Sequence, residues 1–326
     1  MRAMVITKHG GPEVLQVQEV PDPVPADDEV LIRVKAFGIN HAETHMRKGE
    51  WPEATAISGI EAVGTVAHDP SGTLAEGTKV VTLMGGLGRT RNGSYAEYVA
   101  AAATNVTPID SALDWTDLAA IPESYATAWS TLHGNLELRP EHALLVRGAT
   151  SALGQAAVNI AHELGSTVIA TTRREDRDRL LRSLGAEQVV IENGEIANRV
   201  RELNPGGVDR LLDLVGNSVL RDSLRAVRTN GRICQAGFLG GLGPVDGFLP
   251  IVDMPSGVQF SFFGSFELGT EAFPLSAVPL QEIVEKVEAG HYQARPSRVL
   301  DFEEIVEAHR LMEQGEAAGK LVVTGA

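Results

Sequence analysis

The sequence predicts an α/β protein in which a doubly wound parallel sheet forms one domain and a β-rich, barrel-like fold forms the other. Short β-rich segments separated by Gly, Pro and Asp clusters fill positions 1–118. Strand-like and helix-like segments then alternate through 119–291, which is typical of parallel strands covered by helices on both faces. The closing stretch, 292–326, carries one more helix and strand. Its pattern would suit either domain, and we group it with 1–118.

The elements follow in order along the chain. In the first domain, strands are predicted at positions such as 30–36 and 62–66. Helical spacing over 116–136 opens the second domain, and an apolar strand at 143–146 leads into Gly148 and an amphipathic helix that Gly165 ends. Further strands are predicted at 167–171, 188–191, 210–215, 232–236 and 258–263, with helices near 176–184 and 196–203. Asp301 with Glu304 has the spacing of a capping box, followed by a helix to about Glu313 and a strand at 320–323.

Composition agrees with this division and disfavours several functional classes. A chain of 326 residues is long enough for roughly two hydrophobic cores. The net charge of −15 disfavours a non-specific nucleic-acid surface, because phosphate backbones are bound through clustered Lys and Arg. The single cysteine, Cys234, excludes an intramolecular disulfide and a zinc site of several thiolates, and we interpret it as an apolar filler. With no secretion signal and no apolar run of about 18 residues, we expect a cytoplasmic protein without a membrane partner.

The strongest functional signal is a glycine-rich turn between the strand at 143–146 and the helix after it. Gly148 permits a tight turn, Gly154 lets the helix pack on the strand, and small residues between them let a pyrophosphate approach the backbone. The helix N-terminus favours the anion. The spacing is not a strict G-x-G-x-x-G, and the alternative is a βα turn without a ligand. We predict that the turn binds a dinucleotide through Gly148, Thr150, Ser151, Ala152, Leu153 and Gly154.

The end of the next predicted strand indicates which dinucleotide binds. An acidic residue there would hold the ribose 2′-hydroxyl of NADH, whereas an arginine would accept the 2′-phosphate of NADPH. The chain has Thr171, Thr172, Arg173 and Arg174, and no carboxylate before Glu175. Two guanidinium groups with two hydroxyls form a suitable anion pocket, so we predict NADPH. The alternative is that these arginines are only the solvated start of a helix.

Several segments of the chain together resemble the medium-chain dehydrogenase/reductase superfamily, and within it the zinc-free quinone oxidoreductase group. They are GINHAETHMRKG at 38–49, SGIEAVGTV at 58–66, GSYAEYV at 93–99, PESYATAW at 122–129, the turn above and AAGKLVV at 317–323. The resemblance covers nearly the whole chain. It implies a GroES-like β-rich domain and a Rossmann dinucleotide-binding domain.

The resemblance also implies that the zinc sites of related enzymes are missing. Zinc-bearing members have a Cys where this chain has Asn40, a His where it has Ile60, and a further ligand near Glu123. Glu61, which is close to the metal in those members, is present here without the thiolate and imidazole beside it. The cysteine-rich lobe that holds a structural zinc in some members is missing too. We therefore predict that neither zinc is bound.

Three histidines are the remaining metal-ligand candidates in this region. His41, His45 and His68 sit in different local contexts, and we expect no shared helical face among them. Surface or core-edge roles are the expectation for each. No metal site is predicted.

The predicted absence of zinc restricts the reactions that the protein can catalyse. In alcohol oxidation the metal stabilises the alkoxide that loses hydride, so that reaction is disfavoured here. Quinones and activated alkenes accept hydride with little electrophilic help and suit a cofactor held by protein alone. By the resemblance, Asn40 and Thr127 lie near the nicotinamide with Ser124 and Tyr125 close by. Cofactor contacts are also implied for Asn217, Gly237, Phe238, Leu239 and Lys320.

Roles for two of these residues follow from their chemistry. Asn40 would donate an amide hydrogen bond to the acceptor oxygen, and Thr127 would hold the carboxamide or a water molecule. Alternatively, Asn40 fixes a loop and Thr127 packs a helix. No proton donor is assigned, because tyrosines such as Tyr95, Tyr98 and Tyr125 usually pack through their rings.

Three functions stay open at this point. The leading hypothesis is an NADPH-dependent quinone oxidoreductase, and the enzymatic alternative is reduction of the C=C bond of an enal, enone or enoyl thioester. A non-catalytic NADPH-binding redox sensor is the third. The apolar stretch from Phe260 to Gly269 lies at a predicted sheet edge, and by the resemblance we expect a homodimer through that edge.

Overall fold

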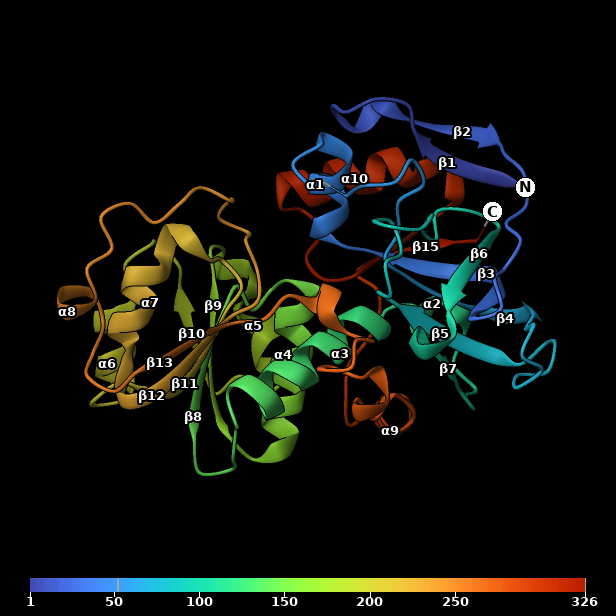
Figure 1. The fold of residues 1–326 in the computed structure, drawn as a ribbon. Coiled ribbons are helices and arrows are strands. Elements are labelled where there is room, and N and C mark those ends of the chain that lie inside the picture. The colour runs from blue at the N-terminus through green and yellow to red at the C-terminus, as the bar shows by residue number, and fades with distance from the viewer. Residues whose placement is uncertain (52, 326) are drawn as a thin grey trace. The chain divides into compact units, whose positions relative to one another are not determined.

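A computed structural model describes residues 1–51 and 53–325 of the chain (Figure 1). It divides into two compact units. Unit 1 comprises Met1–Ala126, Ser265–Gly290 and Ala294–Ala326, and unit 2 comprises Thr127–Gly264 and His291–Gln293. These units differ from the predicted boundaries at 118 and 291, because 119–126 and 265–290 belong to the β-rich unit.

Long-range hydrogen bonds explain why 265–290 belongs to unit 1. Asn105 Nδ2 donates to the carbonyl oxygen of Leu268 at 2.9 Å. Near the end of the segment, Ser111 Oγ donates to the Glu288 carboxylate at 2.6 Å. The alternation of strand-like and helix-like segments in a sequence does not reveal such long-range contacts. For this reason, the prediction grouped 265–290, which contains α9, with the parallel sheet.

Unit 1 is built on a mostly antiparallel sheet. Among the described residues it has seven strands, which follow the order β14-β15-β3-β4-β5-β7, with β6 also pairing with β3; β1 and β2 form a separate pair. The strands are β1 Arg2–Ile6, β2 Leu15–Glu19, β3 Glu29–Ile39, β4 Glu61–His68, β5 Lys79–Leu83, β6 Tyr98–Ala102, β7 Val106–Pro108, β14 Arg298–Leu300 and β15 Leu321–Thr324. The helices are α1 His41–Lys48, α2 Trp115–Leu118, α9 Leu280–Glu288 and α10 Ile305–Gln314, and α3 Pro122–Ser130 begins in this unit.

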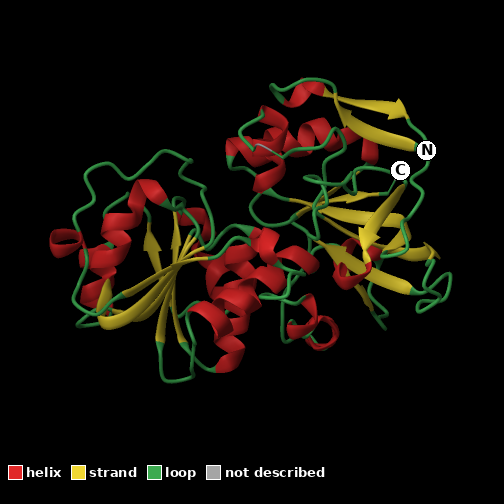
Figure 2. Ribbon diagram, viewed as in Figure 1, coloured by secondary structure: helices red, strands yellow, loops and turns green. Residues whose placement is uncertain are grey.

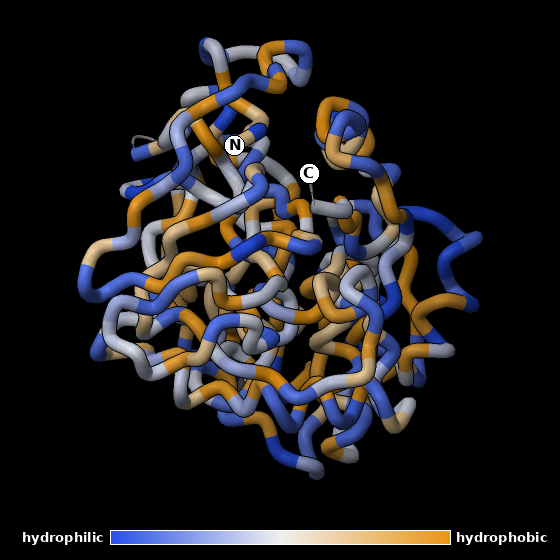
Figure 3. The backbone as a smooth tube through the Cα atoms, turned by 90° about the vertical axis from the view of Figure 1, so that its right-hand side faces the viewer, coloured by the Kyte–Doolittle hydropathy of each residue, from blue (hydrophilic) through white to orange (hydrophobic). Residues whose placement is uncertain are grey.

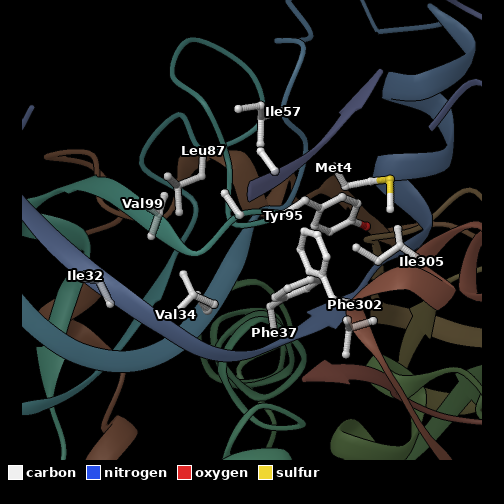
Figure 4. Packing of buried hydrophobic residues seen from close by; sticks show 14 of the residues in the cluster. Met4, Ile32, Val34, Phe37, Ile57, Leu87, Tyr95, Val99, Phe302 and Ile305 are labelled. Carbon is white, nitrogen blue, oxygen red and sulfur yellow. The ribbon is translucent and has the colours of Figure 1, made fainter. Parts of the chain in front are cut away.

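Alternating side chains of β3 direct one face of the strand into the core of unit 1. Buried and more exposed residues alternate through its first half, and its last four residues are all buried. Hydrophobic and hydrophilic positions change repeatedly along the chain in the hydropathy-coloured trace (Figure 3). In the core, the ring of Tyr95 stacks on that of Phe37 with 5.0 Å between centroids (Figure 4). The predicted strands at 30–36 and 62–66 are confirmed as parts of β3 and β4.

The closing stretch of the chain completes the sheet of unit 1. Strand β15 pairs antiparallel with β3 and parallel with β14. The predicted capping box is present at Asp301 and Glu304, and it begins a 3-10 turn that continues into α10. The pairing of β15 with β3 therefore places the closing stretch of the chain in the β-rich unit.

Unit 2 contains a parallel sheet of six strands within the described residues, in the order β10-β9-β8-β11-β12-β13 (Figure 2). The order reverses between β8 and β11, and ligands of such sheets bind outside the carboxyl ends of the strands at this reversal. The strands are β8 Ala143–Arg147, β9 Thr167–Thr172, β10 Gln188–Ile191, β11 Val208–Asp213, β12 Val227–Gln235 and β13 Gln259–Phe262. The helices are α4 Ala152–Leu164, α5 Asp178–Ser183, α6 Ala197–Leu203, α7 Leu220–Ala226 and α8 Pro250–Asp253.

The helical stretch predicted at 116–136 is divided into shorter pieces. Helix α2 ends at Leu118, α3 begins at Pro122, and a π-helical turn follows at Thr131–Asn135. Proline has no N–H and disfavours the helical conformation of the residue before it, so a new helix begins at Pro122. Of the helices in the described ranges, none is long and apolar enough to cross a membrane.

Candidate dinucleotide and catalytic site

The glycine-rich turn lies where β8 passes into α4. Gly148 has φ of +88°, in the left-handed region that favours glycine. Ser151 is the N-cap of α4, and its hydroxyl accepts a hydrogen bond from the Gly154 N–H at 3.1 Å. A Cβ on Gly154 would lie 2.6 Å from both the Ala149 Cα and the Gly148 oxygen, so only glycine fits without a shift. The turn brings the N-terminus of α4 to the carboxyl edge of the sheet, where it can hold a phosphate.

The end of β9 is arranged differently from a simple anion pocket. Thr171 is 1% exposed, and its hydroxyl accepts the Gly148 N–H at 3.1 Å, below the turn. Thr172 is also buried, and its hydroxyl accepts the Arg174 N–H at 3.2 Å. Both arginines are exposed, and Arg174 holds Asp176 through two hydrogen bonds of 3.0 and 2.6 Å. Arg173 makes no ion pair with any residue of 1–51 or 53–325.

The loops after β11 and β12 form the other border of the turn. The Leu239 N–H donates to the Leu214 oxygen at 3.0 Å, and a Cβ on Gly237 would lie 2.6 Å from the same oxygen. The Leu239 side chain lies next to Gly148, since a Cβ there would come within 3.3 Å of Leu239 Cδ1. Asn217 accepts from Gln235 Nε2 at 2.9 Å and donates to the Gly243 oxygen at 2.7 Å. The loops thus meet at the reversal of strand order, with Phe238 between Gly237 and Leu239, and the assignment of these residues as cofactor contacts stays a prediction.

Unit 1 carries a second group of predicted residues. Asn40 lies at the start of α1, Glu61 is the first residue of β4, and Lys320 immediately precedes β15. Lys320 Nζ forms an ion pair with the Glu61 carboxylate, with the two side chains 3% and 0% exposed. Lys320 Nζ also donates to Asn40 Oδ1 at 2.6 Å, and Asn40 Nδ2 donates to Glu61 Oε1 at 2.8 Å.

These contacts determine the orientation of the Asn40 amide. Lys320 has only donors and an ionised Glu61 has only acceptors, so the amide oxygen must face the ammonium and the NH₂ group must face the carboxylate. One N–H of the amide is thereby occupied, and the other makes no hydrogen bond to a residue of 1–51 or 53–325. Gly38 provides the space for the cluster, because a Cβ there would overlap Lys320 and Glu61.

A buried carboxylate that the sequence did not single out supports Asn40 from the other side. Glu43 is fully buried; its Oε1 accepts the Ile60 N–H at 3.0 Å and its Oε2 accepts the Asn40 N–H. Burial raises the pKa of Glu43 to about 7, although the two backbone hydrogen bonds and the charge of Lys320 oppose this. Glu43 is the third residue of α1, so the N-x-x-E spacing of a capping box was the signal that could have identified it.

Further buried groups extend from Glu43 into unit 1. Tyr95, His309 and Arg47 are fully buried, and burial followed by the charge of Glu43 raises the pKa of Tyr95. Arg47 Nη1 lies 3.2 Å from His309 Nδ1, and His309 Nε2 lies 3.1 Å from the Tyr95 hydroxyl. Arginine is only a donor, so Nδ1 accepts and Nε2 carries the proton. Burial lowers the pKa of His309 to about 3, which keeps the ring neutral.

Helix α3 carries Tyr125 and Thr127, which are 3% and 1% exposed. The Tyr125 N–H donates to the Ile121 oxygen at 2.9 Å. The Thr127 oxygen accepts from Thr131 Oγ1 at 2.9 Å. The division between the two units falls between these two residues, after Ala126. Their assignment to the nicotinamide remains a prediction.

The histidines differ from the expectation in one respect. His41 and His45 both lie on α1, one turn apart, with ring centroids separated by 5.2 Å, so they share a helical face. The expectation missed this because it did not place both residues in one helix. Burial, and then the charge of His45, lowers the pKa of His41 to about 4. Over 1–51 and 53–325, no group of three or more His, Cys, Asp or Glu side chains is arranged to hold a metal ion.

Comparison with known proteins agrees with both halves of the structure. Residues 26–111 match the alcohol dehydrogenase GroES-like domain family, and residues 184–323 match a family described as zinc-binding dehydrogenase. The quinone oxidoreductase of Rattus norvegicus is 30% identical over 252 residues, which cover 74% of each chain. A structure titled NAD-dependent alcohol dehydrogenase is 31% identical with a TM-score of 0.85 over all of both chains. The structure of mycobacterial Rv1454c complexed with NADPH is 25% identical with a TM-score of 0.89 over 99% of both chains.

A GroES-like unit joined to a parallel, doubly wound unit defines an oxidoreductase of the medium-chain dehydrogenase/reductase class. The match to the rat enzyme covers about three quarters of both chains. The chain belongs to the quinone oxidoreductase group of this superfamily, and it is an enzyme of that type.

Proposed function

We propose that this enzyme transfers hydride from NADPH to a quinone without a metal ion. The observation that carries the proposal is the Asn40–Glu61–Lys320 cluster. Asn40 is committed to the lysine and the carboxylate, and the neighbouring Ile60 is a hydrocarbon that cannot bind a metal. A lysine ammonium therefore occupies the position next to Glu61. These donor groups support the proposal of zinc independence.

The residues of the chain would contribute binding and electrostatic stabilisation. NADPH, when bound, supplies the hydride. Gly148 to Gly154 and the N-terminus of α4 would hold its pyrophosphate, and Gly237 to Leu239 would border it. The remaining N–H of Asn40 would donate to the acceptor oxygen, where negative charge develops. Because Lys320 and Glu61 hold the amide, Asn40 would not have to reorganise during the reaction.

The decisive experiment compares NADPH oxidation by wild-type protein and by the Asn40→Ala variant with a benzoquinone as acceptor. Loss of an oriented donor should lower kcat/KM by roughly tenfold or more. Asn198→Ala is the matched control, since Asn198 is exposed on α6. A variant with wild-type kcat/KM would remove Asn40 from the mechanism.

The acceptor has a second candidate. A conjugated enone or enoyl thioester also delivers its electrons to a conjugated oxygen, so the same amide would serve it. Parallel assays with a quinone and an enone separate the two, because a kcat/KM tenfold higher for the enone would reverse the assignment. A protein that binds NADPH but oxidises it with neither acceptor would instead favour the redox-sensor hypothesis.

The preference for NADPH rests on the end of β9. Arg173 is exposed and forms no ion pair with the residues that the structure describes, so it is the better of the two candidates for the 2′-phosphate, since Arg174 already holds Asp176. One relative at 31% identity carries a title that names NAD, so the choice needs direct measurement. We expect NADPH to bind at least tenfold more tightly than NADH in calorimetry. Equal affinities would contradict the proposal.

The assembly is a separate proposal. Strand β13 forms the edge of the parallel sheet, and Phe260 and Phe262 on it are 45% and 50% exposed. Aromatic side chains on an unpaired edge strand favour pairing with a second copy. We expect the mass of a homodimer in light scattering at micromolar concentration. A monomer mass would refute this.

A further inference from the structure

A buried polar network lies behind the glycine-rich turn and is centred on Arg147. Arg147 is the last residue of β8, directly before Gly148, and its side chain is 0% exposed. Its guanidinium holds the Glu192 carboxylate through two hydrogen bonds, Nε to Oε2 at 2.8 Å and Nη2 to Oε1 at 2.7 Å. Such a planar, bidentate pair is geometrically specific. The third nitrogen, Nη1, lies 2.9 Å from both Asp222 Oδ2 and Ser223 Oγ.

Thr171 connects this network to the turn. Burial raises the pKa of Glu192, but hydrogen bonds from Arg147, the arginine's charge, the Gly194 N–H and the Thr171 hydroxyl together lower it. The Thr171 hydroxyl is one of the groups that lower the pKa of Glu192, where it can act only as a donor to the carboxylate, and its oxygen accepts the Gly148 N–H at 3.1 Å. The amide of the first glycine of the turn is therefore held by a chain of buried groups that ends at Arg147.

A second arm reaches the loop that follows β11. Ser223 Oγ donates to Asp213 Oδ2 at 2.6 Å, and Asp213 Oδ1 accepts the N–H groups of Val215 and Gly216 at 2.9 and 2.8 Å. Asp213 is fully buried at the end of β11. The two arms link Arg147, directly or through other side chains, to groups at the carboxyl ends of β9, β10 and β11. Arg147 itself is the last residue of β8.

We propose that Arg147, acting through Glu192 and Thr171, is a positioning residue that holds the Gly148 amide and with it the turn in the geometry that binds the dinucleotide. This rests on the proposed function only in taking a nicotinamide dinucleotide as the ligand. It assigns Thr171 to the turn, beneath the cofactor, and not to the 2′-phosphate. The assignment follows from its 1% exposure and from the two bonds of its hydroxyl.

The test is the dissociation constant of the Thr171→Val variant for NADPH and for NADH, measured by calorimetry without any acceptor. Valine keeps the branched shape that suits a strand but removes the hydroxyl. We expect both dissociation constants to rise by the same factor, about tenfold, because the Gly148 N–H loses its buried partner. Thr171→Ser should restore both to within about twofold, since it keeps the hydroxyl.

Controls separate positioning from damage to the fold. Thr167→Val lies at the exposed start of the same strand and should leave both constants unchanged. Glu192→Gln provides a second variant should valine at 171 prevent folding, and it should raise both constants by equal factors, because it weakens the charged pair with Arg147.

The outcomes are distinct. An effect of Thr171→Val on NADPH alone would overturn the inference, because it would place Thr171 against the 2′-phosphate. Dissociation constants of Thr171→Val that equal those of wild type for both dinucleotides would also overturn the inference. The proposed function would still stand in that case, because the wild-type protein would bind the dinucleotide. Wild-type protein that binds neither NADPH nor NADH would refute the proposed function itself and this inference with it.

Discussion

Replacing Glu43 by glutamine should change how the stability of the protein depends on pH. Glu43 is fully buried, and burial raises its pKa from 4.5 to about 7. Between these values the folded state binds more protons than the unfolded state, so the contribution of Glu43 to stability decreases as pH rises. A difference of about 2.5 pKa units corresponds to about 3 kcal/mol, which is lost in full above pH 7.

Other buried groups act in the opposite direction, so the measurement must be a difference. The pKa values of His309 and His41 are lowered to about 3 and about 4, mainly by burial, and their contributions to stability increase as pH rises towards 6.5. Subtracting the free energy of unfolding of wild type from that of Glu43→Gln at each pH removes the contributions of both histidines. The amide also presents an N–H to one backbone donor, which costs roughly 1–3 kcal/mol at every pH and does not alter the slope.

The assay is urea unfolding of both proteins in steps from pH 5 to pH 8 at constant ionic strength. The variant should gain on wild type by up to about 3 kcal/mol across this range. Glu202→Gln, at an exposed position on α6, is the control and should follow wild type at every pH. A difference between Glu43→Gln and wild type that stays constant from pH 5 to pH 8 would refute the reasoning.

Three further predictions concern single positions. Gly154→Ala should raise the dissociation constant for NADPH at least tenfold in calorimetry, because its Cβ would lie 2.6 Å from two backbone atoms of the turn; unchanged binding would show that the turn can shift. Gly38→Ala should separate the buried Lys320–Glu61 pair and destabilise the protein by about 3 kcal/mol in urea unfolding, and a smaller loss than about 1 kcal/mol would contradict this. Cys234 is buried with a pKa raised to about 12 by burial, so a thiol reagent should modify it only after unfolding, and rapid labelling of native protein would be the contrary result.

Local patterns predicted most of the parallel unit. The strand at 188–191 was placed correctly, and the ends of the other strands of the sheet were placed to within five residues, the largest error being at the start of β12. These elements are readable because strand and helix periodicity and glycine stops are properties of neighbouring residues. The boundary at 291 was wrong in placing 265–290 with the parallel sheet, since Asn105 and Ser111 hold that segment from far away in the sequence.

The sequence by itself determined that a glycine-rich turn joins a buried strand to a helix, and that positions 40 and 60 carry an amide and a hydrocarbon. Only the tertiary structure decided what surrounds them. Thr171 was predicted as a cofactor contact, and the fold adds that its hydroxyl accepts the Gly148 N–H; Glu43 was not singled out although it holds both Asn40 and Ile60. The reason is physical: turns and helix caps arise from adjacent residues, whereas the partner of a buried polar group is set by which distant strands the fold brings together.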